Sequence, residues 1–151
     1  MSRVAGKKSI PGSDIVAKTR HGELTVDEVA DLLPGGAEVM EAFGRRYWVM
    51  YYAARGGNWE LARYEWRESA KLLHGLAKTR PKYAEDLAAF ESEAYARVGA
   101  ALEGEDFPAF DRAYRAGIDS SDTYHAKWKK PFIRFRLPDR PPEVLDLRGP
   151  P

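Results

Sequence analysis

The sequence predicts an all-α protein, an antiparallel up-down-up-down four-helix bundle with a short leading helix and an extended C-terminal segment. Apolar residues recur at steps of three and four through four long segments, and helix-capping or helix-breaking residues separate these segments. The connections between them are only a few residues long, which makes sequential helices antiparallel. A chain of 151 residues supports one hydrophobic core. We therefore expect a flexible N-terminal arm at 1–24, a bundle domain at 25–137 and a Pro-rich tail at 138–151.

The leading helix follows an arm without periodicity. Residues 1–24 contain glycine and proline but no sustained apolar pattern, which is typical of a mobile or surface-draped arm. Thr25 and Glu28 have the spacing of a capping box, so a helix is expected to begin there. Pro34, Gly35 and Gly36 end it.

Each long helix has recognisable boundaries. Gly56-Gly57 closes the first, and Asn58 is a good N-cap for the second. Pro81 suits the first turn of the third helix, and Asp106 is the expected N-cap of the fourth. The four predicted long helices cover 37–55, 59–80, 81–103 and 107–128.

The stretch after Trp128 cannot continue the last helix, because Pro131 and Pro138 interrupt it. Aliphatic or aromatic residues alternate with arginine between them. This pattern predicts an extended segment packed along the bundle. In the tail beyond it, the candidate anchors are Val144, Leu145 and Leu147.

Composition excludes several function classes. Lys and Arg number 24 against 23 Asp and Glu, so no overall field attracts nucleic acid or an anionic membrane. The absence of cysteine excludes disulfides, thiolate metal sites and cysteine nucleophiles. There is neither an apolar run long enough to span a membrane nor a signal-peptide core, so a cytoplasmic location is expected.

One end of the predicted bundle collects aromatic and histidine side chains. The topology places the ends of the second and fourth helices, with His74 and His125, beside the starts of the first and third. Those starts carry Phe43, Tyr47 and Tyr83. His125 lies on the inward stripe and is either a half-buried helix-end histidine or an axial metal ligand. His74 lies on a flank, where a solvated or structural role is favoured.

Familiar catalytic constellations are missing. The sequence has no glycine-rich phosphate loop, no His-x-x-x-His pair and no nucleophile elbow. Ser120 and Ser121 precede His125 on one helix, but no oxyanion arrangement accompanies them. A hydrolase is not expected.

Two stretches resemble a known family. Residues 121–125 read Ser-Asp-Thr-Tyr-His and are followed at 130–134 by Lys-Pro-Phe-Ile-Arg, while residues 57–65 read Gly-Asn-Trp-Glu-Leu-Ala-Arg-Tyr-Glu. Together they resemble small four-helix-bundle c-type cytochrome-like proteins, whose last helix carries Cys-x-x-Cys-His. The two stretches span most of 37–137 in the family's order and spacing.

This resemblance implies a haem site with a specific departure. Ser121 and Tyr124 stand where the family has its two haem-attaching cysteines, so covalent attachment is chemically impossible. The resemblance then implies either non-covalent haem with His125 as axial ligand, or a scaffold that has lost haem. His74 is the candidate for a second metal ligand. The implied cofactor-binding residues are His125, Tyr124, Ser121, Trp128, Tyr47, Phe43, Tyr83 and Arg134.

Three functional hypotheses follow. The first is a cytoplasmic protein that binds haem or a metal non-covalently, for electron transfer or small-molecule chemistry. The second is a cofactor-free helical interaction module or subunit whose 129–147 segment docks a partner. The third is a metal-free enzyme at the Tyr/His end. A redox or protein partner and a homodimer are compatible with these hypotheses, whereas nucleic acid and membranes are not expected as partners.

Overall fold

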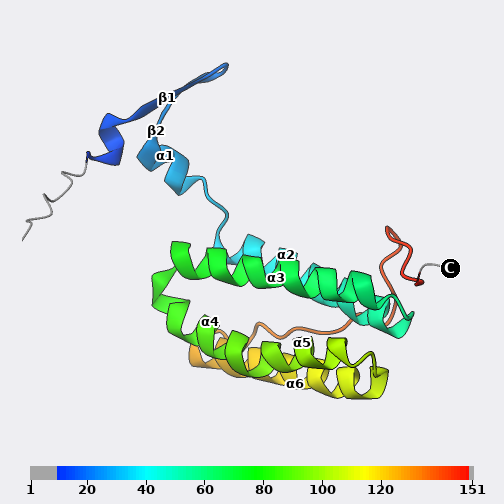
Figure 1. Cartoon of the computed structure of the whole chain (residues 1–151). Helices are drawn as coiled ribbons and strands as arrows, with labels where there is room; N and C mark the ends of the chain where they lie inside the picture. Colours follow the sequence, from blue (N-terminus) through cyan, green and yellow to red (C-terminus); the bar gives the residue numbers. More distant parts are fainter. Residues whose placement is uncertain (1–9, 150–151) are drawn as a thin grey trace, which may run out of the picture. The chain divides into compact units, whose positions relative to one another are not determined.

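A computed structural model describes residues 10–149 of the chain (Figure 1). It divides into two compact units, residues 1–35 and 36–151. The chain is mostly helical, as predicted, with a small two-stranded hairpin near the N-terminus.

The N-terminal unit contains four short elements. A 3₁₀ turn, η1 (Gly12–Asp14), precedes an antiparallel hairpin of β1 (Val16–Thr19) and β2 (Gly22–Thr25), and α1 (Val26–Asp31) follows. The predicted capping box is confirmed, because Thr25 Oγ1 accepts from the Glu28 backbone N–H at 3.2 Å. In return, the Thr25 backbone N–H donates to Glu28 Oε2 at 2.7 Å.

The hairpin was not predicted: it lies within the expected flexible arm at 1–24, of which residues 1–9 lie outside the described residues. Its turn is fixed locally, because Thr19 Oγ1 donates to the Gly22 carbonyl at 3.0 Å and accepts from the His21 N–H at 3.1 Å. Gly22 adopts a φ of 151°, which a residue without Cβ reaches readily. None of the strand residues is buried, so the strands have no apolar alternation for a sequence pattern to reveal.

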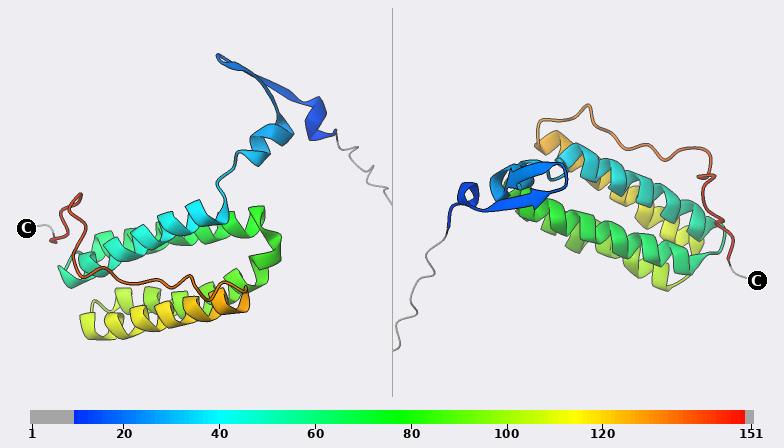
Figure 2. Two further views of the ribbon diagram at one scale, coloured as in Figure 1. Left: turned by 180° about the vertical axis from the view of Figure 1, so that it is seen from behind. Right: turned by 90° about the horizontal axis from the view of Figure 1, so that it is seen from above.

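Unit 36–151 is a bundle of four antiparallel helical segments (Figures 1 and 2). Helix α2 packs mainly against α3, and α5 packs against α6. In chain order the helical elements are α2 (Gly36–Arg55), α3 (Trp59–Thr79), η2 (Pro81–Tyr83), α4 (Ala84–Phe90), η3 (Glu91–Tyr95), α5 (Ala96–Glu103) and α6 (Phe107–Lys127).

Two features differ from the predicted helices. Asn58 caps α3 as expected, accepting from the Leu61 N–H at 3.1 Å, but Asp106 at the start of α6 makes no side-chain capping bond. The third helix contains a π-helical turn, η3, where Tyr95 is fully buried. There the Tyr95 hydroxyl donates to the Trp66 carbonyl at 2.9 Å, and Trp66 Nε1 donates back to the Tyr95 carbonyl at 3.1 Å. The widened turn thus accompanies a two-way connection to α3.

The core is held across α2 and α6 by two tyrosines. Tyr47 donates from its hydroxyl to the Tyr114 carbonyl at 2.8 Å, and Tyr114 donates to the Tyr47 carbonyl at 2.9 Å. The two rings stack with centroids 4.0 Å apart and an angle of 10° between their planes. Both side chains are buried, and both hydroxyls are satisfied.

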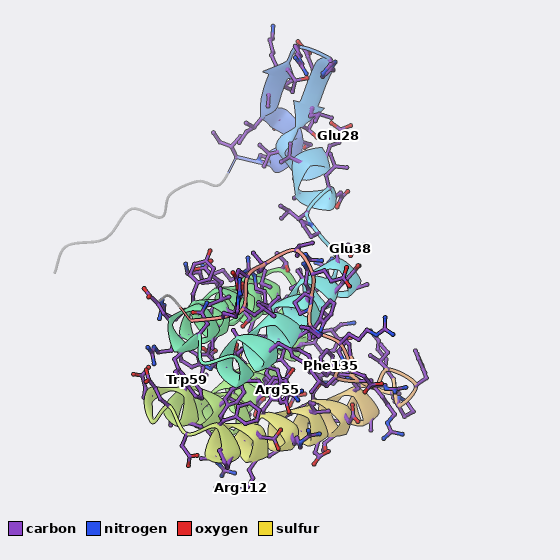
Figure 3. The ribbon with its side chains drawn as sticks, turned by 90° about the vertical axis from the view of Figure 1, so that its right-hand side faces the viewer. Glu28, Glu38, Arg55, Trp59, Arg112 and Phe135 are labelled. Carbon is purple, nitrogen blue, oxygen red and sulfur yellow. The ribbon has the colours of Figure 1, made fainter. Side chains whose placement is uncertain are left out.

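After α6 the chain runs as an irregular segment along the bundle, as the prolines predicted (Figure 2). Tyr52 donates to the Pro138 carbonyl at 2.8 Å, and Trp48 Nε1 donates to the Arg140 carbonyl at 2.9 Å. Phe135 lies beside α2 (Figure 3).

The tail is anchored differently from the expectation. Of its three candidate anchors, Leu147 packs against the core, whereas Val144 and Leu145 are exposed. Side chains of α2 and of the α3 N-cap also donate hydrogen bonds to its backbone carbonyls, and Arg148 forms a β-bridge with Gly57. Within residues 10–149, no helix is both long and apolar enough to cross a membrane.

A glycine comparison tests the α2–α6 contact. A Cβ added at Gly117 would lie 2.5 Å from Tyr47 Oη, whereas one at Gly75, on α3, would meet nothing within 4 Å. We expect Gly117→Ala to lower the free energy of unfolding by about 1–3 kcal/mol, the usual cost of overpacking. Gly75→Ala should raise it by roughly 0.5–1 kcal/mol through helix propensity. Urea denaturation of both variants measures the difference, and equal effects would contradict this account of the contact.

Candidate functional site

A partly open, mainly apolar cavity of about 450 Å³ lies at one end of the bundle. Three parts of the chain supply most of its wall: the first half of α2, the last half of α6, and the segment after α6. Among the lining residues are Met40, Phe43, Tyr47, Phe90, Ile118, Ser121, His125, Trp128, Ile133 and Phe135.

Helical periodicity places the lining residues. On α2, residues 40, 43, 44 and 47 share one face, and on α6 residues 117, 118, 121 and 125 do the same. Gly44 and Gly117 are part of these faces, and the lack of a Cβ at Gly117 gives room to the Tyr47 hydroxyl. A Cβ at Gly44 would lie 3.4 Å from the Phe135 ring, which is ordinary van der Waals contact, so the ring packs directly against α2 at this position.

His125 is the buried ionisable side chain of the cavity wall. Only 8% of the residue is exposed, and Nδ1 is buried without a hydrogen-bond partner among the described residues. The turn that ends α6 fixes its backbone, since the His125 carbonyl accepts from the Lys130 N–H at 2.8 Å. Burial lowers the pKa of the imidazole below its ordinary value, although the Asp122 carboxylate and the Ile133 backbone act in the opposite direction.

An aromatic pair closes the end of the cavity nearest the α6 terminus. The rings of Tyr83 and Trp128 lie 4.5 Å apart between centroids. Trp128 Nε1 donates to Asp86 Oδ2 at 2.7 Å, and Lys127 pairs with the other oxygen of the same carboxylate. These two hydrogen bonds, that of Lys127 foremost, lower the pKa of Asp86. The carboxylate therefore fixes the indole ring that lines the cavity.

Charged side chains lie on the rim. Lys130 and Arg134 come from the segment after α6, and Glu41 comes from α2. Arg134 Nε approaches Asp122 Oδ2 at 3.4 Å, but the Arg134 side chain is 78% exposed. The guanidinium thus remains accessible to a ligand at the rim.

Most of the sequence-predicted site residues meet in this cavity. Those that line it are His125, Ser121, Trp128, Tyr47, Phe43, Tyr83 and Arg134. Tyr124 does not line it, and instead borders a separate void of about 30 Å³ with its ring edge-on to Phe90 at 6.2 Å. The phenol at this position therefore leaves the large cavity open.

His74 lies apart from His125. Its Nε2 contacts both carboxylate oxygens of Glu91, at 2.7 and 2.9 Å, and its side chain is 59% exposed. It does not line the cavity, so the two histidines are not brought together as ligands of one metal. Within the described part of the chain, no group of three or more His, Cys, Asp or Glu side chains is arranged to hold a bare metal ion.

Several cavity residues were not anticipated as site residues. Met40 lies one turn before Phe43 and Gly44 on the same face of α2, so its spacing could have indicated it. Lys130, Ile133 and Phe135 come from a stretch without helical periodicity, and no sequence signal places them beside α2.

The structure also bears on the hypotheses of a metal-free enzyme and of an interaction module. A metal-free nucleophile and its base must be joined by a hydrogen bond. Ser121 and His125 both line the cavity, but within residues 10–149 no hydrogen bond joins their side chains. The segment at 129–147 contacts its own bundle through Phe135 and through its backbone carbonyls, although Phe132 is 80% exposed.

The fold and the cavity define a helical-bundle protein with an apolar, histidine-containing pocket. Comparison of the chain with protein-family models, with curated proteins and with solved structures finds no match.

The lowered pKa of His125 predicts a pH effect on stability. Because the folded protein binds this proton less readily than the unfolded chain, acidification favours unfolding. The loss should begin as the pH falls below about 6.5, the pKa of an unperturbed histidine. Thermal unfolding between about pH 7.5 and 5.5 should show a steeper decline for the native protein than for His125→Gln. Parallel declines would contradict the burial of this ring.

Proposed function

We propose that the bundle binds a flat, mainly apolar small molecule in the cavity beside His125, and that this ligand is haem held without covalent attachment. The observation that carries the proposal is the buried, unpartnered Nδ1 of a histidine whose ring borders an apolar cavity of about 450 Å³. This volume is within the range of about 300–1,000 Å³ that is usual for small-molecule sites.

The donor set fits haem better than it fits a bare metal ion. A bare ion needs several protein ligands, whereas a porphyrin supplies four nitrogens to its iron and needs as few as one histidine from the protein. His125 is the one buried histidine among the described residues. The resemblance drawn from the sequence, in which His125 corresponds to the axial ligand, agrees with this choice. Bound haem would supply one-electron redox chemistry or binding of a small ligand at the iron.

The other cavity residues have distinct expected roles. Phe43, Tyr47 and Trp128 supply apolar surface that excludes water from the ligand. The Tyr47 hydroxyl is already used by the Tyr114 carbonyl, so it makes no demand on the ligand. Lys130 and Arg134 on the rim offer cationic partners to acidic groups that project from the cavity.

A titration with hemin tests the proposal. We expect purified protein to shift the Soret band of hemin with one-to-one stoichiometry. His125→Ala should weaken binding at least tenfold, since it removes the buried ligand atom. His74→Ala is the matched control, because His74 is also on a long helix but pairs with Glu91 at the surface. Binding that is absent, or equally strong in His125→Ala, would refute the haem assignment.

A second titration tests the role of the rim charges. Arg134→Gln removes a guanidinium that can pair with a carboxylate of hemin. It should weaken the binding of hemin by roughly 0.2–1 kcal/mol, the usual contribution of an exposed ion pair. Binding of the neutral dimethyl ester of hemin should be unchanged by this substitution. An equal effect on acid and ester would show that Arg134 acts through packing and not through its charge.

A further inference from the structure

The chain makes a tight turn after α6 and exposes an apolar tip there. The Ile133 N–H donates to the Lys130 carbonyl at 3.0 Å, which puts Pro131 and Phe132 at the two central positions of the turn. Phe132 is 80% exposed and Ile133 is 41% exposed. Little of the Phe132 ring therefore packs on the bundle. We call residues 130–133 the Pro-Phe turn.

The Pro-Phe turn lies within a cationic stretch. Residues 126–138 contain no Asp or Glu but five Lys or Arg residues, which are Lys127, Lys129, Lys130, Arg134 and Arg136. Three of the five pair with carboxylates from elsewhere in the chain. Lys129 and Lys130 enter no ion pair among residues 10–149, so their charges are available to a partner.

Two lysine ammonium groups lie beside one aromatic ring next to the turn. Lys82 Nζ is 4.8 Å from the centroid of the Tyr83 ring, and Lys130 Nζ is 5.9 Å from the same centroid. Lys82 also has no ion-pair partner in the described part of the chain. Like charges held close together repel each other, so an anionic surface beside them is favoured. The acidic residues Glu41 and Glu85 belong to α2 and α4, so the positive charge is a property of the turn and not of this whole end of the bundle.

Lys129 adopts a backbone conformation that favours glycine. Its φ is 61°, and its N–H donates to the Ala126 carbonyl at 3.0 Å, where α6 ends. Glycine is the common residue at such a helix end, because a side chain raises the energy of the left-handed conformation. A lysine there adds a charge at the expense of backbone energy. Strain of this kind directs attention to a use for the side chain.

We propose that the Pro-Phe turn and its lysines bind the protein to an anionic lipid bilayer, with Phe132 inserted among the headgroups. Apolar and aromatic side chains flanked by Lys and Arg are typical of protein segments that lie in a membrane interface. Each Lys close to an anionic leaflet adds to the attraction. The balanced charge of the whole chain provides none, so the attraction must come from this local stretch.

The position of the turn relates membrane binding to the cavity. Lys130, Ile133 and Arg134 line the cavity, so a bilayer in contact with the turn lies beside the cavity rim. An apolar ligand dissolved in the bilayer would then enter the cavity with little exposure to water. This consequence rests on the proposed function, whereas membrane binding is a property of the protein without ligand.

Co-sedimentation of the ligand-free protein with lipid vesicles tests the inference. We expect binding to vesicles of phosphatidylcholine mixed with phosphatidylserine, much weaker binding to phosphatidylcholine alone, and a decrease as salt is added. Phe132→Ala should weaken binding at least about tenfold, because it removes the inserted apolar surface. Tyr64→Ala is the matched control, since Tyr64 is an aromatic residue 46% exposed in the first half of α3, and it should bind as the native protein does.

A lysine substitution separates the charge from folding. Lys129→Gly should raise the free energy of unfolding, because it removes the backbone strain, yet weaken vesicle binding by about fivefold. Lys129→Arg should retain native binding. Arg112→Gln is the control for charge, since Arg112 is an exposed cation near the start of α6, and it should leave binding unchanged.

The outcomes distinguish this inference from the proposed function. Absence of vesicle binding, or binding that is equal in the native protein, Phe132→Ala and Lys129→Gly, would overturn the inference. Binding of soluble polyglutamate in place of vesicles would also overturn it and would indicate an acidic protein partner. Phe132 does not line the cavity, so Phe132→Ala should bind hemin as the native protein does. Hemin binding without vesicle binding refutes membrane binding alone, and vesicle binding without hemin binding refutes the haem assignment alone.

Discussion

The exchange of hydrogen bonds between Tyr47 and Tyr114 is the contact on which the rest of the bundle depends. Each hydroxyl reaches the backbone carbonyl of the other residue, so the axial position of α2 relative to α6 is fixed by two bonds and a stacked ring pair. The hydroxyl of Tyr47 occupies the space above Gly117, where a side chain would not fit. Because Tyr47 and Gly117 both line the cavity, the same contact that aligns the helices also forms part of its wall.

The cavity lies beside this contact and is lined by faces of α2 and α6 that include Tyr47 and Gly117. Beyond Tyr47 the wall is completed by Phe135 from the segment after α6, which approaches α2 at Gly44. At the far end, Asp86 holds the Trp128 indole. The pocket is therefore bounded by side chains whose positions are fixed from outside it, an arrangement that favours a preformed site over one that a ligand must assemble.

The sequence predicted the helices well, because their signals are local. Periodic apolar residues, the Asn58 cap and the Thr25–Glu28 capping box all act within one or two turns, and the structure has each of them. The π-helical turn and the hairpin were missed, since the first follows from how Tyr95 packs on Trp66 and the second from a two-residue turn without buried strands. The site could be predicted in part for the same reason. Helix topology brings His125 to Phe43 and Tyr47, whereas the position of Ile133 and Phe135 depends on the route of a segment without periodicity.

The segment after α6 has a role that its irregular backbone does not suggest. It contributes one side of the pocket, yet it follows all four helical segments in the chain. Without Ile133 and Phe135, which this segment supplies, the wall beside His125 would be incomplete. The enclosure of the pocket therefore depends on a stretch that forms no regular secondary structure of its own.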